Sequence, residues 1–106
     1  MWLVVVHPEA SKFLDNLETV TRSKTRTCLA LLRDYGSLLR QPHSKKIVGH
    51  KNLFELRTSG KSPIRLFYTH FQNKFYILHG FVKKTNKTPI REIDYAVKRQ
   101  MLLTST

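Results

Sequence analysis

The sequence predicts one α+β domain over residues 1–106, with a mainly antiparallel sheet of about four strands. Three segments repeat apolar residues at helical spacing, whereas four short segments are rich in β-branched and aromatic residues. Their order is strand, helix, helix, strand, strand, strand, helix. This order predicts an N-terminal helical hairpin packed on one face of the sheet and a further helix at the C-terminus, with the helices on one face.

The first strand and the first helix come directly after one another. Residues 2–6 are apolar and largely β-branched, which predicts a buried strand. Pro8 ends this strand and suits the first turn of a helix. The apolar stripe over residues 10–20 then predicts an amphipathic helix whose apolar side faces the core.

A polar break at residues 21–24, with Ser23 as the expected N-cap, separates this helix from a second one. The second helix is expected to end near Gly36. Two helices with a short break predict an antiparallel hairpin laid on the sheet. Residues 41–51 are polar and basic, which is typical of a loop.

Three strands are expected at residues 54–57, 64–68 and 75–83. Successive side chains of a strand point to opposite faces. If the apolar side of the first two strands faces the core, Arg57 and Arg65 meet on the other face. The third strand is apolar on both sides, as a central strand is.

In the third strand, strict alternation divides the side chains into two sets. One set is Tyr76, Leu78 and Val82, and the other is Phe75, Ile77, His79 and Phe81. Lys83 and Lys84 follow where this strand ends. Thr88 and Pro89 then predict the N-cap and first turn of the last helix, whose apolar stripe reaches Met101.

Charge is the strongest compositional signal. Lys and Arg total 19 against 7 Asp and Glu, which gives a formal net charge of +12. Such an excess indicates an anionic partner, with nucleic acid the first candidate and an acidic protein the second. Cys28, the single cysteine, cannot form an internal disulfide and is expected to be buried. The apolar start is too short for a leader or a membrane span, so a cytoplasmic protein is expected.

Several stretches together resemble one family, the RelE/ParE toxin superfamily, and within it the HigB-like, phage-related toxins of toxin–antitoxin modules. They are Tyr35-Gly36, Pro42, Lys45-Lys46, Leu-Phe-Glu-Leu-Arg (53–57), Ile-Arg-Leu-Phe-Tyr (64–68), the run from His79 to Pro89, and Glu92, Ala96 and Arg99. The resemblance covers nearly the whole chain. No single motif carries it; the combination in this order does.

The resemblance implies a metal-free, cofactor-free endoribonuclease that enters the ribosomal A site and cuts messenger RNA during translation. It also implies a cognate antitoxin of the HigA-like, helix-turn-helix kind. In such cleavage the ribose 2′-hydroxyl attacks the adjacent phosphate and expels the 5′-oxygen. The reaction needs a proton acceptor, cations for the phosphorane charge and a proton donor for the leaving oxygen.

Carried onto this sequence, the resemblance gives Arg65 the phosphate-clamping role, Arg57 a second phosphate contact and Lys84 the stabilisation of the transition state. Leu53 and Glu55 lie where RelE has a lysine pair, and nothing replaces a tyrosine of its last helix. The proton acceptor therefore stays open among three candidates. They are Glu55, His79 and His50. Further basic side chains are expected to bind RNA, namely Lys45, Lys46, Lys51, Lys83, Lys87 and Arg91.

Each candidate also has a structural interpretation. His79 lies in an apolar strand and is as well explained as a hydrogen-bonded core histidine, and Glu55 as an ion-pair partner of Arg57 or Arg65. The five histidines show no ligand-like spacing, so no metal site is expected. At the level of function, two alternatives remain. One is a ParE-like poison of DNA gyrase, and the other is a non-catalytic basic domain that binds nucleic acid.

Overall fold

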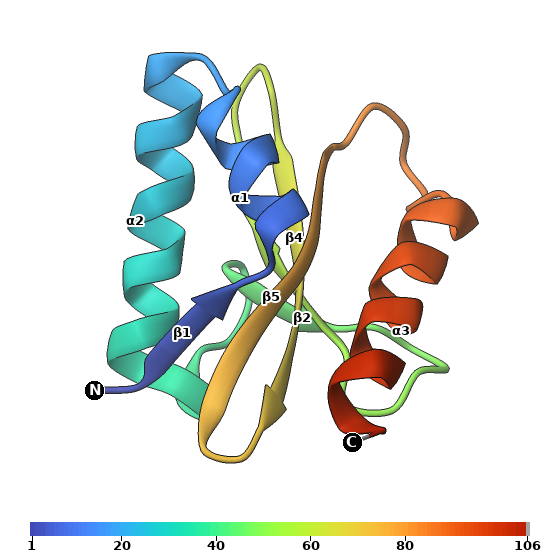
Figure 1. The fold of residues 1–106 in the computed structure, drawn as a ribbon. Coiled ribbons are helices and arrows are strands. Elements are labelled where there is room, and N and C mark those ends of the chain that lie inside the picture. Colours follow the sequence, from blue (N-terminus) through green and yellow to red (C-terminus); the bar gives the residue numbers. More distant parts are fainter. Residues whose placement is uncertain (106) are drawn as a thin grey trace.

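The computed structural model describes residues 1–105 and confirms the α+β class (Figure 1). The elements are β1 (Leu3–Val6), α1 (Pro8–Asp15), α2 (Thr19–Tyr35), a 3₁₀ turn η1 (Gly36–Leu38), β2 (Ser44–Lys46), β3 (Phe54–Arg57), β4 (Ile64–Phe71), β5 (Lys74–Val82) and α3 (Ile90–Thr104). The strands form one sheet in the order β1-β5-β4-β3-β2. Only β1 pairs in parallel, with β5; the other pairs are antiparallel.

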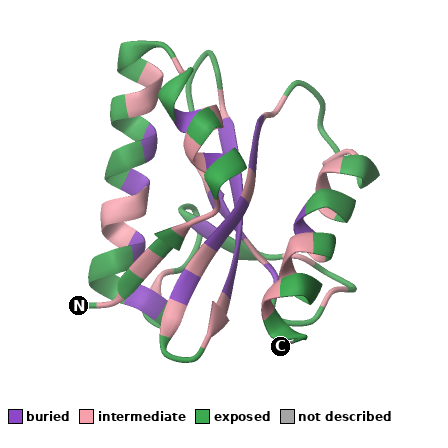
Figure 2. Cartoon of the chain, viewed as in Figure 1, coloured by how far each residue is buried: buried purple, intermediate pink, exposed green. Residues whose placement is uncertain are grey.

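Helices cover both faces of the sheet, whereas the sequence predicted them on one face. α1 and α2 pack on the face that carries Leu56, Leu66 and Ile77. α3 packs on the opposite face through Ala96, against Phe67. Figure 2 shows the buried residues running along β4 and β5, between the two helical layers. A strand with buried side chains on both sides needs a cover on each, which explains why β5 is apolar throughout.

The sheet has five strands instead of about four, because the expected loop at 41–51 contains β2. Ser44 lies opposite Leu56, is buried, and hydrogen-bonds through its hydroxyl to Tyr68. Lys45 and Lys46 are exposed. A three-residue strand of Ser and Lys has little intrinsic strand preference, so pairing with β3 rather than local sequence determines it.

The break between the first two helices lies at residues 16–18, and the prediction of a break at 21–24 is wrong. Glu18, not Ser23, is the N-cap, and its carboxylate accepts the N–H of Thr21 at 3.0 Å. The polar residues that suggested a break lie inside α2. None of these four residues is buried, so their polar side chains reach water from the helix surface.

A β-bulge in β5 corrects the predicted faces of that strand. Phe67 pairs with His79, but the next residue, Tyr68, pairs with Ile77. Leu78 is therefore the extra residue, and the alternation restarts after it. His79 and Phe81 consequently share a face with Tyr76 and Leu78, rather than with Phe75 and Ile77 as predicted. Among residues 1–105, no helix has the length and apolar character needed to cross a membrane.

Candidate active site

One row of side chains crosses three strands on the face that carries α3. Arg57 lies opposite Arg65, and Arg65 lies opposite Phe81. His43 extends the row, because the main-chain N–H of Arg57 donates to the His43 carbonyl at 2.9 Å just beyond β2. The predicted meeting of Arg57 and Arg65 on one face is confirmed. Two like charges directly opposite each other repel, so the arrangement requires an anion nearby.

That anion is Glu55, in the neighbouring row. Its Oε1 lies 3.4 Å from Nε of Arg57 and 3.6 Å from Nε of Arg65. The Glu55 side chain is only 5% exposed, so little water screens either ion pair. One carboxylate oxygen thus lies within ion-pair distance of Nε in both guanidinium groups.

Arg65 is held rigidly. Its side chain is 9% exposed and one terminal nitrogen donates to the carbonyls of Thr58, at 2.8 Å, and of Ile64, at 3.0 Å. Its buried Nε has no hydrogen-bond partner among residues 1–105. Burial, reinforced by the charge of Arg57, lowers the pKa of Arg65, and Glu55 opposes that shift. The group is a cation in a partly dry site, with donor capacity that the protein does not fully use.

Lys83 joins these residues, whereas Lys84 does not. The main-chain N–H of Lys83 donates to the Pro63 carbonyl at 2.9 Å at the end of β5. Burial lowers the pKa of the Lys83 ammonium, and the charge of Arg65 lowers it further. Lys84 instead lines a separate hollow, which it shares with Phe13. We call Glu55, Arg57, Arg65 and Lys83 the arginine cluster.

Thr88 was predicted to cap α3, but it contacts the arginine cluster instead. The cap position is Pro89, which offers no side-chain hydrogen bond. The hydroxyl of Thr88 instead donates to Oε2 of Glu55 at 3.4 Å. The second carboxylate oxygen is thereby partnered, so Glu55 is engaged on both sides.

His79 belongs to a second cluster of polar side chains, and its hydrogen-bond partners lie on α3. Its Nε2 lies 2.9 Å from Oε1 of Glu92, and its Nδ1 lies 3.3 Å from a terminal nitrogen of Arg99. Arginine can only donate, so Nδ1 accepts and Nε2 carries the proton that Glu92 accepts. The ring also lies 5.1 Å from that of Tyr95, centroid to centroid. We call His79, Glu92, Tyr95 and Arg99 the histidine cluster.

The remaining predicted residues are dispersed. Lys45 lies opposite Glu55, on the face of the arginine cluster. His50 is half-buried in the loop between β2 and β3, and its main-chain N–H donates to Ile47. Arg91 lines the hollow that contains Lys84. Exposed positions elsewhere are occupied by Lys46, Lys51 and Lys87.

A hollow of about 250 Å³ opens beside the arginine cluster. Its lining consists of Pro42, His43, Arg57, Thr58, Ser59 and Arg65. His43 is exposed, and its ring has no hydrogen-bond partner among residues 1–105. The sequence assigned no role to this histidine, because nothing indicated that β2 would set it opposite Arg57.

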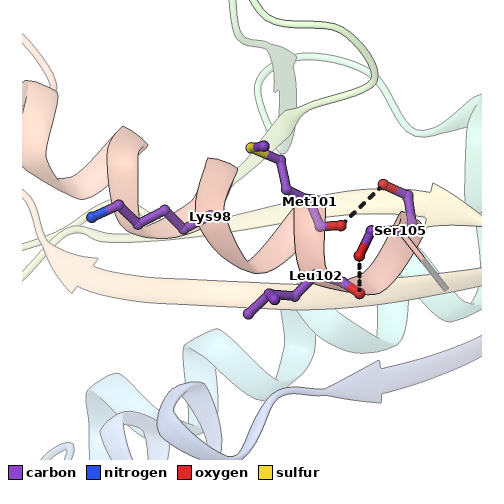
Figure 3. Close-up of a pocket in the computed structure, with 5 residues that line it drawn as sticks. Lys98, Met101, Leu102 and Ser105 are labelled. Carbon is purple, nitrogen blue, oxygen red and sulfur yellow. Dashed lines mark hydrogen bonds between the residues drawn. The ribbon is translucent and has the colours of Figure 1, made fainter.

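Another hollow, of about 570 Å³, lies at the end of α3 (Figure 3). Lys98, Met101 and Leu102 line it, and Figure 3 shows their side chains leaving α3 in different directions. It contains none of the arginine cluster. Within residues 1–105, no three His, Cys, Asp or Glu side chains come together as metal ligands.

Comparisons with known proteins agree with this architecture. Residues 12–101 match the family described as Phage derived protein Gp49-like (DUF891). The chain belongs to this Gp49-like family. No curated protein matches it.

Solved structures show the fold of this Gp49-like chain. A mutant of the E. coli toxin RelE in the free state has a TM-score of 0.68 and 18% identity, over 92% of this chain and 96% of that one. The isolated E. coli RelE toxin has a TM-score of 0.61 and 18% identity, over 94% and 99%. The RelE-like fold that the resemblance implied is confirmed, while the HigB-like branch stays a prediction.

Proposed function

We propose that this Gp49-like protein is the toxin of a toxin–antitoxin module and a metal-independent endoribonuclease that cuts messenger RNA on the ribosome. The observation that carries the proposal is the arginine cluster: two arginines held by one buried carboxylate, with Lys83 on the same face, beside a hollow of about 250 Å³. Cations fixed in a partly dry site stabilise the charge that develops on a phosphorane.

Arg57 and Arg65 bind the scissile phosphate. A guanidinium stays charged and can bind two phosphate oxygens at once. Glu55 holds both groups through Nε, so neither arginine has to be ordered when the substrate arrives. Glu55 itself is a positioning residue in this mechanism, because both its oxygens are engaged and its side chain is 5% exposed.

Proton transfer falls to His43 and Lys83. His43 lines the hollow with a free ring, so it accepts the proton of the 2′-hydroxyl as that oxygen attacks the phosphate. Lys83 gives a proton to the departing 5′-oxygen, since its lowered pKa makes the ammonium a better donor. The products are a 2′,3′-cyclic phosphate and a 5′-hydroxyl. Loss of cleavage in His43→Ala, with recovery on adding imidazole to the buffer, would test this assignment.

The antitoxin is the second partner. The net charge of +12 favours fast, electrostatically steered capture by an acidic surface. A HigA-like antitoxin with a DNA-binding helix-turn-helix is the form that the family resemblance favours.

Induced expression in bacteria, followed by mapping of new 5′ ends in transcripts, tests the function. We expect cuts confined to translated frames, lost in Arg65→Ala and retained in Arg26→Ala, an exposed control on α2. Circular dichroism of each purified variant checks its folding. Growth arrest with DNA damage and no cuts would instead support a gyrase poison, and RNA binding without cuts or arrest would support a non-catalytic domain.

A further inference from the structure

The turn between β3 and β4 joins the arginine cluster to the start of α2. Figure 1 shows this yellow-green turn beside the first turns of α2. Thr58 and Ser59, in the turn, line three hollows of about 250, 240 and 510 Å³. The first contains Arg57 and Arg65, and the last two share Lys24. The three hollows adjoin one another around this turn, because Thr58 and Ser59 line all of them, and we call them together the loop trough.

Two lysines supply positive charge at the far end of the loop trough. Lys24 and Lys61 line the hollow of about 510 Å³ and are exposed. Neither has a carboxylate within ion-pair distance among residues 1–105. The ammonium nitrogen of Lys24 lies 3.1 Å from where a Cβ at position 60 would stand. Gly60, with φ +111°, thus lets the cation lie directly over the turn.

The remaining lining is mixed, with hydroxyl-bearing residues beside the apolar Val20, Cys28 and Leu31. Glu18 is the one acidic residue lining the trough in the described part of the chain, and its carboxylate is already bound to the N–H of Thr21 as the N-cap of α2. Thr58, Ser59 and Ser62 also line the trough. The Thr58 hydroxyl accepts the N–H of Ile64 at 2.9 Å, whereas the exposed hydroxyls of Ser59 and Ser62 are open to the ribose and phosphate groups of a nucleic-acid strand.

We infer that the loop trough binds the ribose–phosphate backbone of RNA next to the phosphate held at the arginine cluster, with Lys24 and Lys61 as phosphate contacts. The inference rests on the proposed function, because the arginine cluster sets one end of the path. Phosphates follow one another at short, regular intervals along a strand, so a strand held at the arginine cluster can reach the exposed lysines of the adjoining hollows. The RNA is either the cleaved strand or ribosomal RNA beside it.

The test compares two pairs of charge-neutralising substitutions. Lys24→Gln with Lys61→Gln removes the cations of the trough. Lys12→Gln with Lys98→Gln removes two charges from exposed positions on α1 and α3. Affinity is measured over a range of salt for a short 2′-O-methyl single-stranded RNA, which resists cleavage, and for ribosomes programmed with messenger RNA. A polyglutamate peptide serves as the competing anion.

For the trough pair we expect about ten-fold weaker RNA binding near 0.1 M salt, and a salt slope reduced by about 1.4, since each single-strand phosphate contact contributes about 0.7. The control pair should change the slope far less. An effect on free RNA identifies the cleaved strand, and an effect on ribosomes alone identifies ribosomal RNA. If both pairs of substitutions weakened RNA binding equally, or if the trough pair weakened only polyglutamate binding, the inference would be overturned. Cleavage by the wild type would still support the proposed function. Absence of wild-type binding in both RNA arms would overturn it together with the proposed function.

Discussion

The arginine cluster and the histidine cluster lie on the same face of the sheet but differ in what covers them. The side chains of α3 provide a partner for each ring nitrogen of His79. Arg65 and His43, by contrast, line an open hollow, and the His43 ring has no hydrogen-bond partner among residues 1–105. A helix laid over one part of a sheet therefore satisfies the polar groups beneath it. The groups beyond its reach keep hydrogen-bonding capacity for a ligand.

The largest effect is expected from removing the anion of the arginine cluster. Glu55→Ala leaves Arg57 and Arg65 opposite each other without compensation. Breaking a buried ion pair from one side costs several kcal/mol, so the free energy of unfolding should fall by about 3 kcal/mol in urea denaturation. Glu55→Gln, which keeps the shape, should lose less. Unchanged stability of both variants would mean that the carboxylate does not hold the arginines.

Arg57→Ala should separate binding from stability. Arg57 is 27% exposed and Glu55 keeps Arg65 after its loss, so the protein should stay folded. Cleavage of ribosome-bound messenger RNA should fall about a hundred-fold, which is typical of removing one group that stabilises transition-state charge. Arg26→Ala provides the exposed arginine control. A cleavage rate within a few-fold of the wild type would remove Arg57 from the site.

His79→Ala tests the contrast between the two clusters at the histidine cluster. It removes the hydrogen bonds to Glu92 and Arg99, so the free energy of unfolding should fall by roughly 1–2 kcal/mol. The folded variant should cleave RNA within about three-fold of the wild type. If cleavage disappeared while the variant stayed folded, His79 would be a catalytic residue and the division between the two clusters would be wrong.

The smallest effect concerns pH. Burial lowers the pKa of His7, and Arg99 and His79 add to that shift while Glu9 opposes it. The unfolded chain therefore binds a proton more readily, so this histidine favours the folded state above the ordinary pKa near 6.5 and that contribution is lost as pH falls. Unfolding measured at pH 5, 6 and 7 should show this loss in the wild type.

His7→Asn provides the comparison, because asparagine keeps an acceptor for the Glu9 N–H, which His7 accepts at 3.1 Å. The variant should lose less stability between pH 7 and pH 5 than the wild type. An identical pH dependence of the two proteins would show that His7 makes no contribution.

The sequence predicted one part of the site because a regular strand has a period of two. Arg57 and Arg65 could be assigned to one face from alternation alone. In β5 the alternation is interrupted by the bulge at Leu78. The sequence could not predict this bulge, because an extra residue cannot be recognised within a run of apolar residues. The bulge places Lys83, rather than Lys84, on the face of Arg65.

His43 could not be found in the same way. The strand that sets it opposite Arg57 consists of Ser44, Lys45 and Lys46, and it pairs with β3 through main-chain bonds that any sequence can make. The covering of one sheet face by α3 also escaped prediction, since an amphipathic helix does not state which face it covers. The available signal for a second covering helix was that β5 carries apolar residues on both of its sides.

The central claim is that the arginine cluster, and not the histidine cluster, cleaves RNA. Arg65→Lys and Arg99→Lys test it as a matched pair, because both arginines donate to main-chain carbonyls and both substitutions keep the charge. The measurement is the cleavage rate on purified ribosomes programmed with messenger RNA. We predict a loss of about a hundred-fold for Arg65→Lys and less than about three-fold for Arg99→Lys. Equal losses, or the larger loss in Arg99→Lys, would contradict the account.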